Sequence, residues 1–258
     1  MEESFSTFAN KIQYPHVHLS FDDHSISGWY TARGNLMFKK AKAVFYVDSF
    51  DELDDEDIDR LRSLRSDGHI IGCHSATHAD AIAYSKKYSI DAYIENEIIP
   101  AMESMAEAGF SPTHFAFPNS SFDQTLYEAV SKLFCYVRPR NESHFYTKSQ
   151  MYIQGDRLNG QHETCEHRIR QGNMGEVIKD IKEHLKSNHG ISLVFHDVRR
   201  KGQPKHSGTR ASDTAYITVE ELDTILSAIN SMGVSYETFS NQNCENTKKL
   251  FDKPNGLL

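Results

Sequence analysis

The sequence predicts an α/β fold, an irregular seven-stranded (β/α) barrel. Two observations support this prediction. Short apolar runs alternate along the chain with longer segments of helical periodicity, which is the pattern of parallel strands joined by crossover helices. The chain has 258 residues, of which 38% are hydrophobic and 25% charged, so it is long enough for one barrel domain. Seven strands are too few for the eightfold pattern of a regular barrel, so we expect irregular closure.

Seven apolar runs are expected to form strands. In the first run, Val17, Leu19 and Phe21 alternate with polar residues. The sixth run, ISLVFHD, is the most apolar of all. The segment 151–153 is a candidate for a further short strand. The seven expected strands cover residues 16–23, 41–48, 69–73, 113–118, 135–140, 191–197 and 234–239.

Six segments between these runs are expected to form helices. Asp123 and Thr218 are expected N-caps, and Glu221 completes a capping box with Thr218. Gly68 and Gly109 are expected to end the helices that precede them. The expected helices cover residues 28–40, 54–66, 90–108, 123–133, 174–187 and 218–232.

The alternation indicates one domain over residues 1–258, with a folded core at about 16–240 and a polar tail at 241–258. Two polar segments, 141–172 and 199–217, interrupt it. A connection as long as the first of these is usually functional when it occurs in a compact domain.

Charge and cysteine content exclude several classes of protein. The formal net charge of −8 argues against a nucleic-acid binder or an anionic-membrane binder, since either favours a basic face. No apolar run approaches the roughly 20 residues of a membrane-spanning helix, and the first residues lack the layout of a signal peptide. The four cysteines form no CxxC pair, and Cys73 and Cys135 lie within apolar runs. We therefore expect free thiols and a cytoplasmic location, with the oligomeric state left unknown.

Three of the apolar runs end in residues that can carry chemistry. Asp22 and Asp23 close the first run, and His196 closes the sixth. The third run, HIIGCHSATH, places His74 and His78 four residues apart, a spacing that arises readily by chance in a chain with 14 histidines. The carboxyl ends of parallel strands meet at one rim of the sheet, where α/β proteins carry their active sites. We therefore expect these five residues to lie together.

Their chemistry predicts a hydrolytic metal centre. The carboxylate of Asp23 and the imidazoles of His74 and His78 supply three ligands and leave a position open for water. Zn²⁺ is the expected metal, and a mixed carboxylate–imidazole site also accepts Co²⁺, Ni²⁺ or Fe²⁺. Asp22 is then free to take a proton from water. His196, on a different strand, could protonate a leaving group from the other side.

Four segments resemble the motifs of a known family. SFDDHS, HSATH, FAFPNS and LVFHD follow the order and spacing of the polysaccharide deacetylases, the NodB-homology fold of carbohydrate esterase family 4. The resemblance covers about residues 16–240 and implies the irregular seven-stranded barrel of that family. A backbone donor to an oxyanion is typically worth ~3 kcal/mol in the transition state. By matching position, the resemblance implies a catalytic base at Asp22, a catalytic acid at His196, metal ligands at Asp23, His74 and His78, and an oxyanion donor at the backbone N–H of Asn119.

The chain departs from the family pattern at three places. Ala116 stands where the family has the arginine that pairs with the base aspartate. The aspartate that orients the acid histidine has no clear counterpart, and Asp156 and Arg168 are the candidates to replace it. His24 occupies the position of a glycine that usually follows the paired aspartates, which makes the rim more crowded.

The expected function is metal-dependent removal of an N-acetyl or related acyl group from an amino sugar or polysaccharide. Hydrolysis of a small non-sugar C–N amide bond, or of an acetyl ester, on the same fold is an alternative. A carbohydrate-binding protein with impaired catalysis is another, because the arginine is missing at Ala116. His196 could also be a buried histidine bonded to backbone. Trp29 could stack on a substrate, although we expect it in the core.

Overall fold

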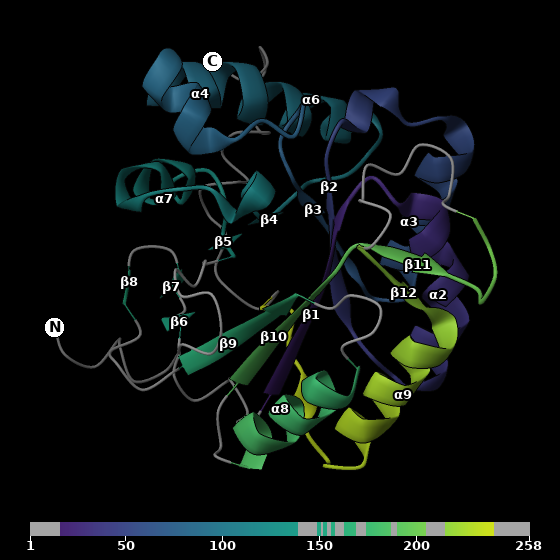
Figure 1. Cartoon of the computed structure of the whole chain (residues 1–258). Coiled ribbons are helices and arrows are strands. Elements are labelled where there is room, and N and C mark those ends of the chain that lie inside the picture. Colours follow the sequence, from purple (N-terminus) through teal and green to yellow (C-terminus); the bar gives the residue numbers. More distant parts are fainter. Residues whose placement is uncertain are drawn as a thin grey trace, which may run out of the picture.

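The computed structural model describes residues 16–138, 149–150, 152–153, 156–157, 163–168, 174–186, 190–204 and 215–239. Within these ranges a mostly parallel sheet is curled into an incomplete barrel and helices pack around it (Figure 1). The fold class predicted from the sequence is therefore confirmed. No helix within the described ranges is both long and apolar enough to cross a membrane.

Within the described residues, seven parallel strands form the main path of the sheet, with a further parallel strand, β13 (Ser235–Tyr236), beside the start of β1. The strand at its centre, β1, pairs with β10 over Val17–Phe21 and with β2 over Leu19–Asp23. In spatial order the parallel strands are β9 (Glu163–Arg168), β10 (Gly190–Phe195), β1 (His16–Asp23), β2 (Ala43–Val47), β3 (Ile70–Cys73), β4 (His114–Phe115) and β5 (Tyr136–Val137).

Shorter strands complete the sheet. The strand expected at 234–239 is reduced to β13 (Ser235–Tyr236), which pairs in parallel with the start of β1. The sixth expected strand is divided at His196, because β10 ends at Phe195 and β11 (Asp197–Arg199) then pairs with β12 (Tyr216–Thr218) in a separate sheet. The antiparallel strands at the two ends of the main sheet are β6 (Ser149–Gln150), β7 (Tyr152–Ile153) and β8 (Asp156–Arg157).

Helices follow the expected segments with two differences. The sequence did not predict α4 (Ala81–Lys87), and the helix expected at 90–108 contains a π-helical turn, η2 (Ile94–Ile98). The predicted caps are confirmed at Asp123 and at the Thr218 capping box. The other helices are α2 (Ile26–Phe38), α3 (Asp55–Ser66), α5 (Ile90–Tyr93), α6 (Ile99–Glu107), α7 (Gln124–Val130), α8 (Met174–Lys186) and α9 (Val219–Asn230), with short 3₁₀ turns η1 (Phe50–Glu52) and η3 (Pro118–Ser120).

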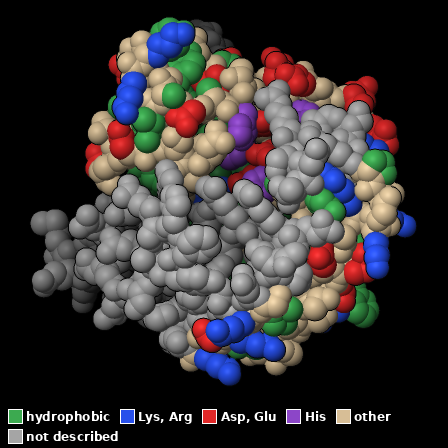
Figure 2. Space-filling model, viewed as in Figure 1, with side chains coloured by type: hydrophobic (Ala, Val, Ile, Leu, Met, Phe, Trp, Pro, Cys, Tyr) green, Lys and Arg blue, Asp and Glu red, His purple; other side chains and the backbone are tan. Residues whose placement is uncertain are grey.

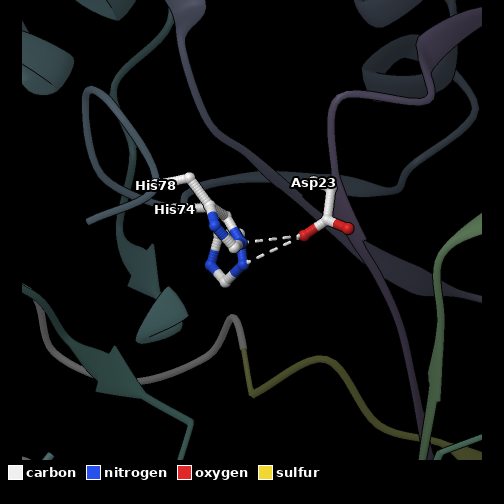
Figure 3. Close-up of side chains that lie close together, drawn as sticks. All are labelled: Asp23, His74 and His78. Carbon is white, nitrogen blue, oxygen red and sulfur yellow. Dashed lines mark hydrogen bonds and ion pairs between the residues drawn. The ribbon is translucent and has the colours of Figure 1, made fainter. Parts of the chain in front are cut away.

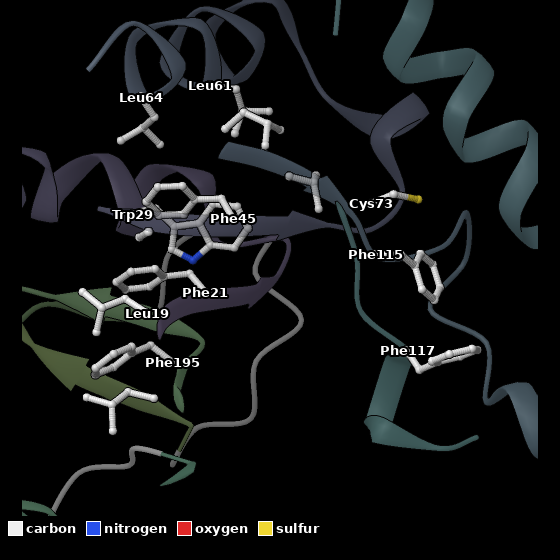
Figure 4. Packing of buried hydrophobic residues seen from close by; sticks show 14 of the residues in the cluster. Leu19, Phe21, Trp29, Phe45, Leu61, Leu64, Cys73, Phe115, Phe117 and Phe195 are labelled. Atoms are coloured by element: carbon white, nitrogen blue, oxygen red, sulfur yellow. The ribbon is translucent and has the colours of Figure 1, made fainter. Parts of the chain in front are cut away.

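The outer face of β1 packs against the helices. Phe21 stacks between Phe45 of β2 and Phe195 of β10, with ring centroids 4.9 and 5.0 Å away (Figure 4). Trp29 of α2 lies 5.3 Å from Phe45 and is fully buried. Trp29 is therefore a core residue, as expected. Burial of several large aromatic side chains, each worth roughly 1.5–3 kcal/mol, fixes the position of β1 between its neighbours.

The inner face of β1 is polar and buried. His16, His18, Ser20 and Asp22 alternate with the apolar residues, and each is at most 4% exposed. The alternation would suit a strand with one side in water, but closure of the barrel places this side in the interior. Polar side chains thus lead along β1 to its carboxyl end.

Two buried histidines inside the barrel are held in their neutral form. The Nδ1–H of His18 donates to the carbonyl of Glu237 at 2.9 Å, and the Nε2–H of His114 donates to the carbonyl of Thr238 at 2.7 Å. Burial lowers the pKa of His18 to about 3 and that of His114 to about 4. Both folded-state pKa values lie below the unfolded value of 6.5, so protons bind preferentially to the unfolded chain in weak acid.

Stability is therefore expected to fall as the pH drops from about 6.5 towards 4. The loss at pH 5 relative to pH 7.5 is roughly 2 kcal/mol for each of the two histidines. Denaturant titrations at both pH values measure it. The double variant His18→Gln/His114→Gln is expected to be less stable at pH 7.5 but to change less between the two pH values. An equal change in wild type and double variant would contradict this assignment.

Candidate active site

An aspartate and two histidines lie together at the carboxyl rim of the sheet. Asp23 is the last residue of β1, and His74 and His78 follow β3. Asp23 Oδ1 is 3.1 Å from Nε2 of His78 and 3.5 Å from Nε2 of His74 (Figure 3). The three potential ligand atoms lie within 4.8 Å of one another. The predicted cluster is therefore present.

Parallel strand order explains why these residues meet. β1 pairs with β2 and β2 with β3, so the ends of β1 and β3 reach the same rim. Asp23 has a φ of 81° and His78 a φ of 60°, both in the left-handed region. The chain therefore turns at these residues, and Asp23 no longer follows the strand alternation. Figure 2 shows histidine and acidic side chains gathered on this face of the molecule.

The donor set fits a divalent metal ion. The Nδ1–H of His74 donates to the carbonyl of Ala116 at 2.7 Å, which fixes the tautomer and leaves the Nε2 lone pair facing Asp23. One carboxylate and two imidazoles are ligands that Zn²⁺ and similar ions accept, with a further position left for water. Among the described side chains, this is the group of three that could hold a metal.

The charges in the cluster favour an ionised Asp23 and a protonated His74 when no metal is bound. Burial alone would raise the pKa of Asp23, but hydrogen bonds with His74 and His78 hold it well below its usual value. Burial alone would lower the pKa of His74, but the Asp23 and Asp22 carboxylates raise it. Protons therefore compete with a metal ion for His74, and metal binding is expected to weaken in acid.

Asp22 lies beside the cluster and is paired with an arginine that sequence reasoning missed. Two nitrogens of Arg138 donate to the two Asp22 oxygens, each at 2.6 Å, and one of them also donates to Ser20 Oγ at 3.0 Å. Arg138 directly follows β5 and is 4% exposed, with its guanidinium 5.0 Å from the centre of the Tyr46 ring. The missing arginine at Ala116 is thus replaced from the next strand.

Arg138 keeps the carboxyl group of Asp22 ionised. Burial would raise the pKa of this carboxyl, but the charge and hydrogen bonds of Arg138 hold it below its usual value. Asp22 is therefore ionised at neutral pH and can accept a proton. Bidentate pairing also fixes the orientation of its carboxylate.

His196 lies on the other side of Asp23, between β10 and β11. Its Nε2 is 4.0 Å from Asp23 Oδ2, and its backbone carbonyl accepts a hydrogen bond from Trp29 Nε1 at 2.7 Å. Burial lowers the pKa of His196, and the two aspartates partly offset this effect. Its Nδ1 has no hydrogen-bond partner among the described residues. The side chains of Asp156 and Arg168, the candidates to orient it, lie outside the described part of the structure.

The turn after β4 carries Asn119. This residue is exposed and has a φ of 56° within η3. The same strand end supplies the Ala116 carbonyl that holds His74. Asn119 is thus at the rim, and its role as an oxyanion donor stays a prediction. His24 is also at the rim and hydrogen-bonds through Nδ1 to the carbonyl of Asp48 at 3.0 Å.

The expectation of free thiols is only partly correct. Cys73 is free and buried, and burial raises its pKa to about 12. Cys135 is disulfide-bonded, so the prediction of a reduced core thiol is wrong there. Local spacing, on which the prediction rested, does not reveal pairs that form through tertiary proximity. A disulfide is typical of oxidising compartments, whereas the sequence suggested the cytoplasm.

Comparisons with known proteins agree with this description. Residues 10–136 match the family model described as polysaccharide deacetylase. A search of curated proteins gives no match. The fold is similar to that of a family 4 carbohydrate esterase from Streptomyces lividans in complex with acetate, at 16% identity over 87% of this chain and 93% of that chain, with a TM-score of 0.52.

Two further solved structures have comparable similarity. The peptidoglycan deacetylase PdaC from Bacillus subtilis matches at 16% identity over 92% of this chain and 93% of that chain, with a TM-score of 0.54. A family 4 acetyl xylan esterase from Clostridium thermocellum, in complex with a cobalt ion, matches at 21% identity over 86% of each chain, with a TM-score of 0.53. The chain resembles the polysaccharide deacetylase family over residues 10–136, and it shares the fold of family 4 carbohydrate esterases.

Proposed function

We propose that the protein is a metal-dependent deacetylase that removes an N-acetyl or related acyl group from an amino sugar or polysaccharide. The observation that carries this proposal is the Asp23–His74–His78 cluster with an ionised Asp22 beside it. Zn²⁺ is the proposed metal, with Co²⁺, Ni²⁺ or Fe²⁺ as substitutes. A structural neighbour holds a cobalt ion, which supports a divalent metal of this kind.

The residues of the cluster have distinct proposed roles. Asp23, His74 and His78 hold the metal, which when bound would polarise the acyl carbonyl and make a water molecule more acidic. Asp22 accepts a proton from the attacking water because Arg138 keeps its carboxylate ionised and oriented.

The products require a second proton transfer. Hydrolysis breaks the bond between the acyl carbon and nitrogen and forms a carboxylate and an amine, so the leaving nitrogen needs a proton. His196 is proposed to donate it, and the 4.0 Å between its Nε2 and Asp23 Oδ2 supports this role. A lowered pKa makes its imidazolium a stronger acid, although the neutral imidazole is then the major form at neutral pH. The backbone N–H of Asn119 is proposed to bind the oxyanion, which typically contributes ~3 kcal/mol.

Acetyl ester hydrolysis is the second candidate, because one structural neighbour is described as an acetyl xylan esterase. Small non-sugar amides are the remaining substrates to consider. The binding-protein interpretation rested on the missing arginine, and Arg138 removes that argument.

The test is acetate release by the metal-loaded protein from four substrates: an N-acetylglucosamine oligomer, acetylated xylan, a small non-sugar acetamide and an aryl acetate. We expect the N-acetylated oligomer to be hydrolysed and the activity to disappear with a chelator and return with Zn²⁺. Preference for acetylated xylan over the oligomer would favour the esterase. Absence of acetate release from all four would reject the proposed function.

A further inference from the structure

The loop that carries His78 has an unusual backbone. It runs from Ser75 to His78, and these two residues have φ values of 72° and 60°. Neither is a glycine, so both have a left-handed backbone conformation that side chains disfavour. Such a conformation persists only when the surrounding structure enforces it. Within the loop, the backbone N–H of His78 donates to Ser75 Oγ at 3.1 Å. A further group is needed to hold Ala76 and Thr77, the two residues between Ser75 and His78.

Glu97 supplies that group. One of its carboxylate oxygens accepts the backbone N–H of Thr77 at 2.9 Å, and the other accepts the Thr77 hydroxyl at 2.6 Å. The backbone carbonyl of Glu97 accepts the N–H of Ala76 at 2.8 Å. Glu97 is 3% exposed, so these bonds form in a site with little competition from water. One residue therefore binds both central residues of the loop.

A local irregularity of the helix accompanies this contact. Glu97 lies in the π-helical turn η2, in which the N–H of Ile99 donates to the carbonyl of Ile94, five residues back. Pro100 follows directly, at the start of α6. A proline has no N–H and its ring clashes with the carbonyl four residues before it, so a regular α-helix is disfavoured there. Single π-helical turns often occur at functional sites.

The two histidines of the cluster differ in how they are held. The His74 ring is 2% exposed and is fixed by the Ala116 carbonyl. The His78 side chain is 22% exposed, and the hydrogen-bond partner of its ring among the described residues is Asp23. The position of His78 thus depends on the backbone of its loop, whereas that of His74 does not.

We infer that Glu97 is a positioning residue that holds the loop of residues 75–78 so that His78 can bind the metal together with Asp23 and His74. This inference rests on the metal site of the proposed function. Outer groups that orient a ligand typically change metal affinity 10- to 100-fold when they are removed. Glu97 acts on the backbone of the ligand loop and does not contact the metal.

The variant Glu97→Gln tests this role. The amide keeps the size of the side chain but loses one of the two acceptors for Thr77. We expect Zn²⁺ affinity, measured in the full chain by competition with a chromophoric chelator, to fall at least tenfold. Glu95→Gln is the matched control, because Glu95 lies in the same π-helical turn but is exposed. It is expected to leave the Zn²⁺ affinity unchanged.

A double-variant cycle separates positioning of His78 from a general effect on folding. In a His78→Ala background, Glu97→Gln should weaken Zn²⁺ binding by less than twofold, because the ligand that it positions is gone. An undiminished tenfold loss in that background, or unchanged affinity in Glu97→Gln alone, would overturn the inference. If Glu97→Gln does not fold, Thr77→Val removes the hydroxyl partner alone and is expected to weaken binding in the same His78-dependent way.

Failure of the metal site itself gives a different result. If wild type shows no saturable Zn²⁺ binding, or if Asp23→Ala binds Zn²⁺ as tightly as wild type, both the proposed metal site and the role of Glu97 are rejected. If wild type binds Zn²⁺ and Asp23→Ala does not, an unaffected Glu97→Gln variant rejects the role of Glu97 alone.

Discussion

The variant Asp22→Asn is expected to keep its metal and to lose hydrolysis by roughly 10²–10⁴-fold, the range typical for loss of a general base. Asparagine has the same size and can still accept a hydrogen bond from Arg138, but it cannot take a proton from water. Asp22 is not part of the group of potential ligands, so the Asp23–His74–His78 cluster remains complete.

Metal content by elemental analysis and acetate release are measured on the same preparation of Asp22→Asn. His196→Ala is the companion variant. It is expected to reduce hydrolysis of an amide more than hydrolysis of an activated aryl acetate, whose leaving group needs no proton. Full metal content together with undiminished turnover in Asp22→Asn would reject Asp22 as the base.

The variant Arg138→Ala is expected to lose activity by about 10²-fold, with its pH profile shifted. Arg138 lowers the pKa of Asp22, so removal of Arg138 raises that pKa. As the pH falls, the Asp22 carboxylate is then protonated, and stops acting as a base, at a higher pH than in wild type. The acidic limb of the profile for kcat/KM should therefore move to higher pH. Breaking a buried ion pair from one side also typically lowers stability by about 3–5 kcal/mol, which a denaturant titration measures separately.

A rescue experiment distinguishes the role of Arg138 in catalysis from its role in folding. Ala116 is buried beside Tyr46, over whose ring the Arg138 guanidinium lies. Adding Ala116→Arg to Arg138→Ala restores an arginine directly after β4 and is expected to recover part of the activity and the acidic limb. Arg138→Lys keeps the charge without the bidentate geometry and should be intermediate. A pH profile unchanged in Arg138→Ala would show that Arg138 does not tune Asp22.

The rim of the sheet could be predicted from the sequence because each residue there closes an apolar run. This logic brought Asp22, Asp23 and His196 together from strands far apart in the chain. Arg138 closes the run CYV in the same way, but its partner was sought at Ala116, on the strand before. Strand ends indicate which residues share a rim, but not which of them pair.

Other features have no local signal. Helical periodicity over 90–108 gives no sign that Glu97 is buried, because the π-helical turn displaces the face of the helix that meets the barrel. The helix α4 was missed because it is short and because Ala81 alone of its residues is buried, so it has no repeating apolar face. His16 and His18 alternate with apolar residues as on a half-exposed strand, and only closure of the barrel buries them.

The most direct test of a metal-dependent hydrolase at this site is the metal content of Asp23→Ala and His78→Ala, measured by elemental analysis beside acetate release from an N-acetylglucosamine oligomer. Wild type loaded with Zn²⁺ is expected to retain about one ion per chain after gel filtration, whereas each variant should lose most of its metal and its hydrolysis together. Metal content and acetate release equal to wild type in both variants would contradict the assignment of Asp23, His74 and His78 as the metal site.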